Sequence, residues 1–396
     1  MKKVIILFFY ILGVSLLFYY DFFTPPQQEQ FVKLAASFLQ GKLYFLSPTF
    51  DAAINSGHYY WPLGPFPAIL LMPFVYIFGD HMRQGYLLFF LNILNAFLLF
   101  RIAKKLSGNF VNSLIVSFAV SFSTAYLGIA LIPWSWYYAQ TVGFTLTLLA
   151  LEAYFFNRSY LLIGSYIALA FSTRVSLIFT AVFFILNLFY SESSMKLKFR
   201  KLSILIIPII ISIMVLGFYN YARFGNPWET GYSKQSLDGP VGAGRIFGLW
   251  NIKHIPTNLY SMFLKMPDPL FIPRTNIMQF PYLKADGSGI SILFTSPIFF
   301  WILFSNWKDK KVKFAGITAL IMMFALWGSF SNGSWQYGYR YAIDSYPFAS
   351  IILIYSFKKD VSYKFLTIAI VAFLINLYFI NTIFYPSIMP ILDYFK

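Results

Sequence analysis

Carboxylates are scarce in this sequence, with 14 acidic residues among 396. Each one outside the basic clusters is therefore a candidate for chemistry. Asp21 and Glu29 come just after the first apolar segment, where they would lie at the membrane surface. Partial burial raises the pKa of such a carboxyl group, which can then take a proton from an acceptor hydroxyl. The alternative is an interfacial charge that ends a helix or favours its dipole. Asp51 is the weaker candidate because it lies in a polar stretch of loop.

Two arginines have surroundings that suggest a binding role. Arg174 stands between two apolar runs, and a charge within a membrane segment costs about 2.5–3.5 kcal/mol on insertion scales. Such a residue pairs with a partner or lines a pathway, unless a short loop carries it to water. Arg340 lies in the aromatic-rich stretch 333–344. Its guanidinium suits a phosphate and the aromatic rings suit a sugar or a lipid, although an arginine among interfacial aromatic residues can also be a simple anchor.

The run from Gly57 to Pro67 holds His58 among tyrosines, glycines and prolines just before an apolar segment. The prolines and glycines fix an unusual approach of the chain to the membrane. His58 could bind a phosphate or assist proton transfer, but a single interfacial histidine more often does neither.

Several common catalytic patterns are absent from the sequence. It has no Asp-x-Asp pair, no Walker A loop and only three histidines, which are not spaced as metal ligands. Divalent metal sites need clustered carboxylate or imidazole ligands, and a Walker A loop cradles nucleotide phosphates. We therefore expect neither a metal nor a nucleotide cofactor. The chain also has no cysteine for thiol or disulfide chemistry.

The elements that position these residues are predicted to be membrane helices. Hydrophobic residues make up 59% of the chain and charged residues 11%, with a mean hydropathy of +0.66, whereas soluble domains carry roughly a quarter charged residues. The net charge of +16 comes from short basic clusters between apolar runs. This pattern is typical of cytoplasmic loops and argues against nucleic-acid binding. The sequence thus indicates an all-α polytopic membrane protein.

Twelve apolar segments can be recognised, several of them shorter than the roughly 17–25 residues that span a bilayer. The basic clusters place the N-terminus inside and loops 21–64, 220–289 and 331–345 outside. With the C-terminus outside as well, we expect about eleven transmembrane helices. The non-crossing segment should then lie in 160–190 or, second, in 65–103. Residues 29–39 carry apolar side chains on one helical face, so the first loop should contain a short amphipathic helix.

Four motifs, in order along the whole chain, carry a resemblance to a known superfamily. They are Gln28-Glu29-Gln30-Phe31 with Gly41-Lys42-Leu43-Tyr44, Gly57 to Pro62 with Pro65 and Pro67, Asn220 to Pro227 with Thr230 to Tyr232, and Tyr339-Arg340-Tyr341 with Pro347. Together they resemble the polytopic C-type glycosyltransferases (GT-C) that use a lipid-phosphate sugar, in particular the protein O-mannosyltransferase and aminoarabinose transferase group. One departure is that Gln28 stands where the family usually has the first residue of an acidic pair.

The resemblance implies a single transmembrane glycosyltransferase-like domain over residues 1–396. It would transfer a hexose or pentose from a polyprenyl-phosphate donor to a hydroxyl of a glycan, lipid or protein acceptor at the outer face, with inversion. No metal or other cofactor would be needed, since the lipid-linked sugar phosphate is a co-substrate. Glu29 would be the base, with Asp21 as a substitute. Arg340 and Arg174 would bind the donor phosphate, with Arg223, His58, Tyr60 and Tyr339 as further donor-binding candidates.

Other functions fit part of the pattern. A transporter or lipid flippase explains the helices and Arg174, but it predicts polar residues along a through-path rather than on one face. An O-antigen polymerase or ligase shares the large outer loops but gives the first-loop carboxylate no role. A non-catalytic scaffold is suggested only by Gln28. The composition further suggests a multi-pass protein of a bacterial inner membrane.

Overall fold

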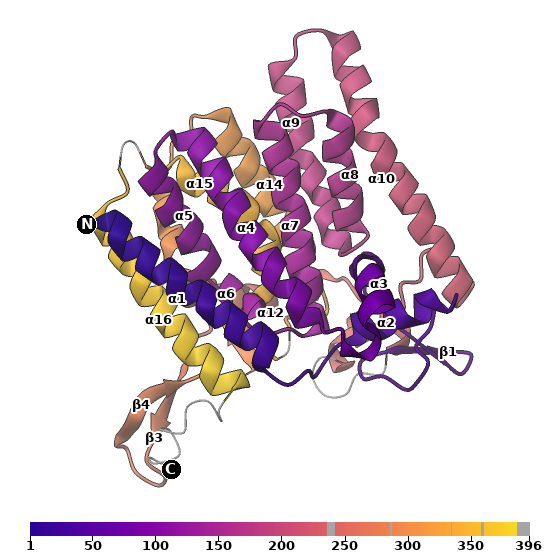
Figure 1. The fold of residues 1–396 in the computed structure, drawn as a ribbon, viewed down its shortest axis with the longest axis horizontal. Coiled ribbons are helices and arrows are strands. Elements are labelled where there is room, and N and C mark those ends of the chain that lie inside the picture. The colour runs from indigo at the N-terminus through magenta and orange to yellow at the C-terminus, as the bar shows by residue number, and fades with distance from the viewer. Residues whose placement is uncertain (236–241, 286, 334, 358–359, 386–396) are drawn as a thin grey trace.

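The chain folds into a bundle of helices linked by long loops (Figure 1). This computed structural model describes residues 1–235, 242–285, 287–333, 335–357 and 360–385. Within those ranges, four helices are both long and apolar enough to cross a membrane. The expected membrane-helical class is therefore confirmed, whereas the number of crossings stays a prediction. These four are α1 (Lys2–Phe23), α4 (Gln84–Ser107), α10 (Met195–Phe224) and α16 (Tyr363–Phe384).

The remaining helices are shorter, and several predicted segments are broken. The apolar run 111–131 divides into two α-helices, and the run 290–305 is one turn of α-helix followed by a 3₁₀ helix. The shorter helices are α2 (Gln30–Leu39), α3 (Phe66–Phe78), η1 (Gly79–His81), α5 (Phe110–Phe122), α6 (Tyr126–Ala130), α7 (Ser135–Phe155), α8 (Tyr160–Phe171), η2 (Val175–Thr180), α9 (Ala181–Ser191), η3 (Tyr232–Lys234), η4 (Gly244–Phe247), η5 (Ile252–His254), α12 (Ile255–Phe263), α13 (Ile292–Thr295), η6 (Pro297–Phe304), α14 (Lys310–Trp327), η7 (Arg340–Ser345) and α15 (Tyr346–Ile354).

Short strands, which the all-α prediction did not include, pair within the loops. β1 with β2 and β3 with β4 are antiparallel, and β5 with β6 is parallel. Each pair is a separate two-stranded sheet, so the strands order loops and do not build a layer of the fold. They are β1 (Ala53–Asn55), β2 (His58–Tyr60), β3 (Asp268–Phe271), β4 (Met278–Lys284), β5 (Ser288–Ile290) and β6 (Gln336–Gly338).

The bundle has two different ends (Figure 1). The strand pairs, α2 and the long loops gather at one end, which we call the loop end. The α9–α10 connection lies at the opposite end, beside the basic stretch 196–201. Helix α7 runs through the middle of the bundle and packs against both α4 and α8. Its residues are buried on nearly every side, as expected for a helix surrounded by other helices.

The two segments predicted to contain a stretch that does not cross the membrane, 160–190 and 65–103, have different structures. Helices α8 and α9 form a hairpin whose turn at residues 172–174 points toward the loop end. Helix α3 packs against α2, and the next long helix, α4, starts close to the residue that precedes α2. Helix α3 thus packs on α2 at the loop end, and the start of the following helix α4 lies beside the start of α2.

A close backbone approach joins the first loop to the α8–α9 turn. The Phe66 backbone N–H donates a hydrogen bond to the Ser172 carbonyl, 3.3 Å away. At Gly64, a Cβ atom would come within 2.1 Å of that same carbonyl oxygen, so this position has no room for a side chain. The contact holds the start of α3 against the turn that carries Arg174.

Candidate functional site

A large cavity of about 2080 Å³ lies between the first loop, α8, α10 and the C-terminal segments. Its polar lining comes from residues far apart in the sequence that the fold brings together. The polar lining includes Asp51, Arg174, Ser176, Arg223, Tyr232, Gln235, Arg340 and Tyr341. Asp51 is the one described carboxylate among the lining residues.

Asp51 is held at the cavity wall by two hydrogen-bond donors. The indole N–H of Trp136 donates to Oδ2 at 2.9 Å, and the amide of Gln235 donates to both Oδ1 and the backbone carbonyl of Asp51. Burial raises the pKa of Asp51 to about 6, although these hydrogen bonds and the nearby Arg340 and Arg245 favour its charged form. An ionised carboxylate accepts about four hydrogen bonds, so the group keeps acceptor capacity for a substrate hydroxyl.

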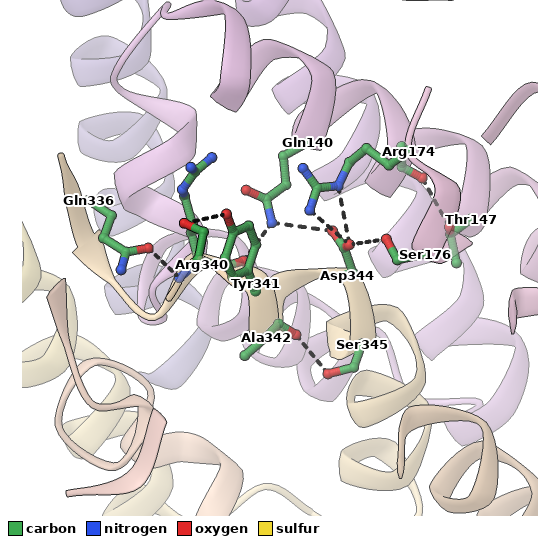
Figure 2. Close-up of polar contacts among 12 residues, drawn as sticks. Gln140, Thr147, Arg174, Ser176, Gln336, Arg340, Tyr341, Ala342, Asp344 and Ser345 are labelled. Atoms are coloured by element: carbon green, nitrogen blue, oxygen red, sulfur yellow. Dashed lines mark hydrogen bonds and ion pairs between the residues drawn. The ribbon is translucent and has the colours of Figure 1, made fainter. Parts of the chain in front are cut away.

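Arg174 reaches the cavity from the α8–α9 turn and is neutralised by a buried partner. Its Nη2 lies 3.1 Å from Oδ2 of Asp344, and its Nε lies 3.2 Å from the same atom. Ser176 and Gln140 also donate to the Asp344 carboxylate (Figure 2). A buried ion pair with satisfied hydrogen bonds is rigid. Asp344 thus fixes the direction of the Arg174 side chain.

Arg340 differs from Arg174 in that its charge is not paired. No carboxylate in the described ranges lies within ion-pair distance of its guanidinium, and its Nε is buried without a hydrogen-bond partner. The guanidinium lies over the rings of Tyr341 and Tyr137, with centroid distances of 5.0 and 5.6 Å. In Figure 2, the Arg340 guanidinium has no dashed contact, whereas its main chain is bonded to Gln336 and Gln140. This cation is available to an anionic ligand.

Glu29 and Asp21 lie outside the described lining of the cavity. Oε1 of Glu29 accepts a hydrogen bond from the backbone N–H of Gln84, the first residue of α4, at 2.9 Å. Burial raises the pKa of Glu29, and its place at a helix start is the structural alternative considered for it. Asp21 is 2% exposed in α1. For both residues the catalytic role stays a prediction, and the geometry favours Asp51.

Four other donor-binding candidates have contacts of their own. Arg223 lines the cavity, but it donates to the Trp61 carbonyl and to Asn220 and lies 3.8 Å from the Tyr219 ring centroid. His58, Tyr60 and Tyr339 lie outside the described cavity lining. His58 stacks on Tyr44, Tyr60 contacts Phe224, and the Tyr339 hydroxyl donates to Asn258. The binding role of these four residues stays a prediction.

The cavity has two chemically different sides. One side, which we call the tail side, is lined by α10, the α8–α9 hairpin and α14, whose lining residues are mostly apolar but also include Arg174 and Arg223. The other side, which we call the tryptophan side, is lined by the first loop, the start of α7 and the end of α16. The tail side includes Ile178, Phe179, Met214, Phe218, Phe324 and Leu326, and the tryptophan side includes Gln27, Gln28, Phe50, Trp134, Trp136 and Phe384.

Sequence reasoning ranked Asp51 low and did not select Trp136 or Gln235. These residues come from three distant segments, so no local motif links them. One signal was present, because Asp51 comes shortly before the Gly57–Pro67 run that was recognised as unusual. In the described part of the chain, no group of three or more His, Cys, Asp or Glu side chains is arranged to hold a metal ion.

The fold is similar to that of solved membrane glycosyltransferases. The oligosaccharyltransferase of Archaeoglobus fulgidus, in its apo form, superposes with a TM-score of 0.50 at 12% identity, over 94% of this chain and 54% of that chain. ArnT from Cupriavidus metallidurans, in its apo state, gives a TM-score of 0.50 at 10% identity, over 88% of this chain and 59% of that chain. The chain has the fold of these glycosyltransferases, as the resemblance to the GT-C group predicted.

The GT-C fold covers most of this chain, while the chain spans a little over half the length of either solved protein. The sequence itself matches no protein-family model and no curated protein. The apolar helices and the GT-C fold indicate a multi-pass membrane protein. At these identities the likeness establishes the fold and not the substrates.

Proposed function

We propose that this GT-C protein transfers a sugar from a polyprenyl-phosphate donor to an acceptor hydroxyl at the loop end of the bundle. One observation carries the proposal. A single cavity holds a hydrogen-bonded carboxylate, Asp51, and an unpaired guanidinium, Arg340, next to a long apolar wall. A sugar phosphate on a lipid needs these features, namely a base, a phosphate-binding cation and a surface for the tail.

The transfer is a single displacement. The acceptor hydroxyl gives its proton to Asp51 while its oxygen bonds to the anomeric carbon. The bond between the anomeric carbon and the phosphate oxygen breaks at the same time, and its electron pair stays on the polyprenyl phosphate. That phosphate gains one negative charge, so it needs a cation rather than a proton donor. The attack from the opposite side inverts the anomeric centre.

Arg340 is the proposed partner of the leaving phosphate. A guanidinium binds phosphate oxygens through paired N–H donors, and in the described ranges no carboxylate competes for that of Arg340. Arg174 lies on the same cavity but shares its charge with Asp344. We therefore assign Arg174 a positioning role, in which it keeps the cavity wall and Tyr341 in place, at a ring centroid distance of 5.9 Å.

The proposal also covers the position of the donor tail, the number of membrane crossings, the membrane and the transferred sugar. The donor tail would lie on the tail side of the cavity, against the exposed face of α10. Eleven crossings result if α3 stays at the loop end and each other apolar helical unit crosses once, with α5 and α6 as one unit and α13 and η6 as another. The bacterial inner membrane, the absence of a metal, and a hexose or pentose as the transferred sugar are part of the same proposal.

Donor binding tests the proposal most simply. Protein in lipid nanodiscs would be titrated with a panel of polyprenyl-phosphate hexoses and pentoses, comparing wild type with Arg340→Ala and Arg340→Lys. We expect saturable binding of at least one donor. Affinity should fall by about tenfold to a hundredfold in Arg340→Ala, in line with about 1.5–3 kcal/mol for a hydrogen bond to a charged group. Arg340→Lys should recover part of it.

The contrary results are equally clear. If no member of the donor panel binds to the wild-type protein, the transferase proposal fails and a transporter of another solute becomes the better account. Equal binding by wild type and Arg340→Ala would remove Arg340 from the phosphate site.

A further inference from the structure

The tryptophan side of the cavity is a continuous aromatic surface. The ring of Trp134 stacks on Tyr137, with centroids 5.9 Å apart and planes 15° apart. Its centroid lies 6.3 Å from that of Trp136 and 5.4 Å from that of Phe384. Phe50 adds an edge-on contact with Trp136 at 6.4 Å. These neighbours fix the planes of both indole rings, and both rings line the cavity.

The orientation of Trp136 is tied to Asp51. The indole N–H donates to Oδ2 of Asp51, so the edge of the ring points at the carboxylate. A flat apolar ligand that covers this ring lies immediately beside the base. For a sugar ring, whose C–H groups form an apolar face and whose hydroxyls lie around the rim, this contact brings one hydroxyl toward Asp51.

The other lining residues on this side are uncharged. Besides Asp51, and Arg340 over the Tyr137 ring, the residues named for this side are the aromatic residues and the amide side chains of Gln27 and Gln28. Gln28 uses its Oε1 to accept from Gln30, which leaves its N–H donors without a described acceptor. Neutral amides with aromatic rings match neutral hydroxyl groups, whereas a phosphorylated or acidic acceptor would need cations.

We infer that the acceptor is a neutral saccharide that stacks on Trp134 and Trp136. The inference rests on the proposed transferase function and narrows its acceptor to one chemical class. The sugar ring covers the indole faces, Gln27 and Gln28 meet its outer hydroxyls, and the hydroxyl beside Trp136 gives its proton to Asp51. A peptide or a lipid hydroxyl as acceptor is the alternative outcome.

The test uses the full chain in nanodiscs with a bound polyprenyl-phosphate sugar. Donor consumption would be followed alone and with neutral oligosaccharides (gluco-, manno- and galacto-oligomers), a serine- and threonine-containing peptide, or phosphatidylglycerol. We expect the oligosaccharides to accelerate consumption. In Trp134→Ala the KM for the saccharide should rise about tenfold, as for the loss of one aromatic contact, while the KM for the donor stays unchanged.

Conservative variants separate binding from folding. Trp134→Phe keeps a ring and should recover most of the saccharide affinity. Trp307 is a matched control because it lies just before α14, away from the cavity lining, so Trp307→Phe should leave both KM values unchanged. An equal loss of donor and saccharide affinity in Trp134→Ala would overturn the stacking role.

The possible outcomes distinguish the proposed transferase function from the saccharide acceptor. A protein that binds no donor contradicts the proposed function itself. A protein that consumes donor faster with the peptide or with phosphatidylglycerol, and not with any oligosaccharide, keeps the proposed function and overturns the saccharide inference. Donor consumption that none of the three acceptor classes accelerates also overturns it.

Discussion

At the scale of single residues, the surroundings of Asp51 have opposing effects on the pKa of its carboxyl group. Burial disfavours its charge, and the donors Trp136 and Gln235 together with the nearby Arg340 favour it. The balance leaves a pKa of about 6, close to the range in which a general base works well near neutral pH. A carboxylate in water, with its lower pKa, would be a weaker base.

This balance predicts the pH dependence of turnover. Asp51 can accept a proton only when ionised, so the rate should rise as the pH passes through about 6 and level off above it. Trp136→Phe removes a hydrogen bond that favours the ionised form, so the rising limb should move to higher pH. Initial rates at saturating donor would measure both profiles. A rate that does not change between about pH 5 and pH 8 would contradict the role of Asp51.

The sequence led to Glu29 as the proposed base, whereas the geometry favours Asp51 for that proposed role. Glu29 was selected because it follows the first helix and matches a motif, and the structure places it at the N-terminus of α4. Asp51 could not be preferred from sequence, because its partners Trp136 and Gln235 lie 85 and 184 residues away. The guanidinium of Arg340 lies over the rings of Tyr137 and Tyr341, while its role in phosphate binding stays a prediction.

At the scale of elements, the site depends on how the first loop meets the α8–α9 turn. Gly64 lies against the Ser172 carbonyl, two residues before Arg174. The hydrogen bond from the Phe66 backbone N–H to the Ser172 carbonyl joins the same two segments. This contact joins the loop that carries Asp51 to the turn that carries Arg174.

Gly64→Ala should therefore damage both stability and turnover. The added methyl would come within 2.1 Å of the Ser172 oxygen, and such overpacking typically costs about 1–3 kcal/mol. Thermal unfolding in detergent should show a clear fall in Tm. Gly217→Ala is the control, because the nearest atom outside its helix is 3.7 Å from the added Cβ and its Tm should not fall. Unchanged Tm and turnover in Gly64→Ala would mean that the contact is not needed.

Elements with a strong local signal could be predicted, and those made by long-range contacts could not. The amphipathic segment 29–39 forms α2 at almost the expected residues, because its apolar face has helical spacing. The strands β1 and β2 have three residues each. Such short strands cannot show an alternation of apolar and polar residues in the sequence. Their pairing depends on the turn at Gly57, whose φ is +77°.

At the scale of the whole molecule, the separation of basic clusters from polar loops organises the protein. The sequence predicted three polar loops on one face, and Figure 1 places the loop-end elements together, opposite the α9–α10 connection. The composition was sufficient to predict this grouping of loops, since few charged residues remain once the basic clusters are placed on the opposite face. The exact crossings could not be predicted, because short helices such as α3 and α8 fall below the spanning length.

The absence of cysteine makes the topology directly testable. Asp80→Cys, between α3 and α4, should react with a membrane-impermeant maleimide in sealed cells, because α3 is expected to stay at the outer face. Ser193→Cys, between α9 and α10, should react only after permeabilisation. The cysteine-free parent gives the background. Protection of Asp80→Cys in sealed cells would mean that α3 crosses the membrane.

The central claim is that Asp51 is the base of a polyprenyl-phosphate sugar transferase, and turnover by matched variants tests it most directly. Consumption of a bound donor would be compared in wild type, Asp51→Asn, Glu29→Gln and Asp21→Asn in nanodiscs. We predict that Asp51→Asn binds donor normally and loses about 10²–10⁴-fold in rate, while the other two variants remain active. Full activity in Asp51→Asn together with an inactive Glu29→Gln would contradict the account and return the base to Glu29.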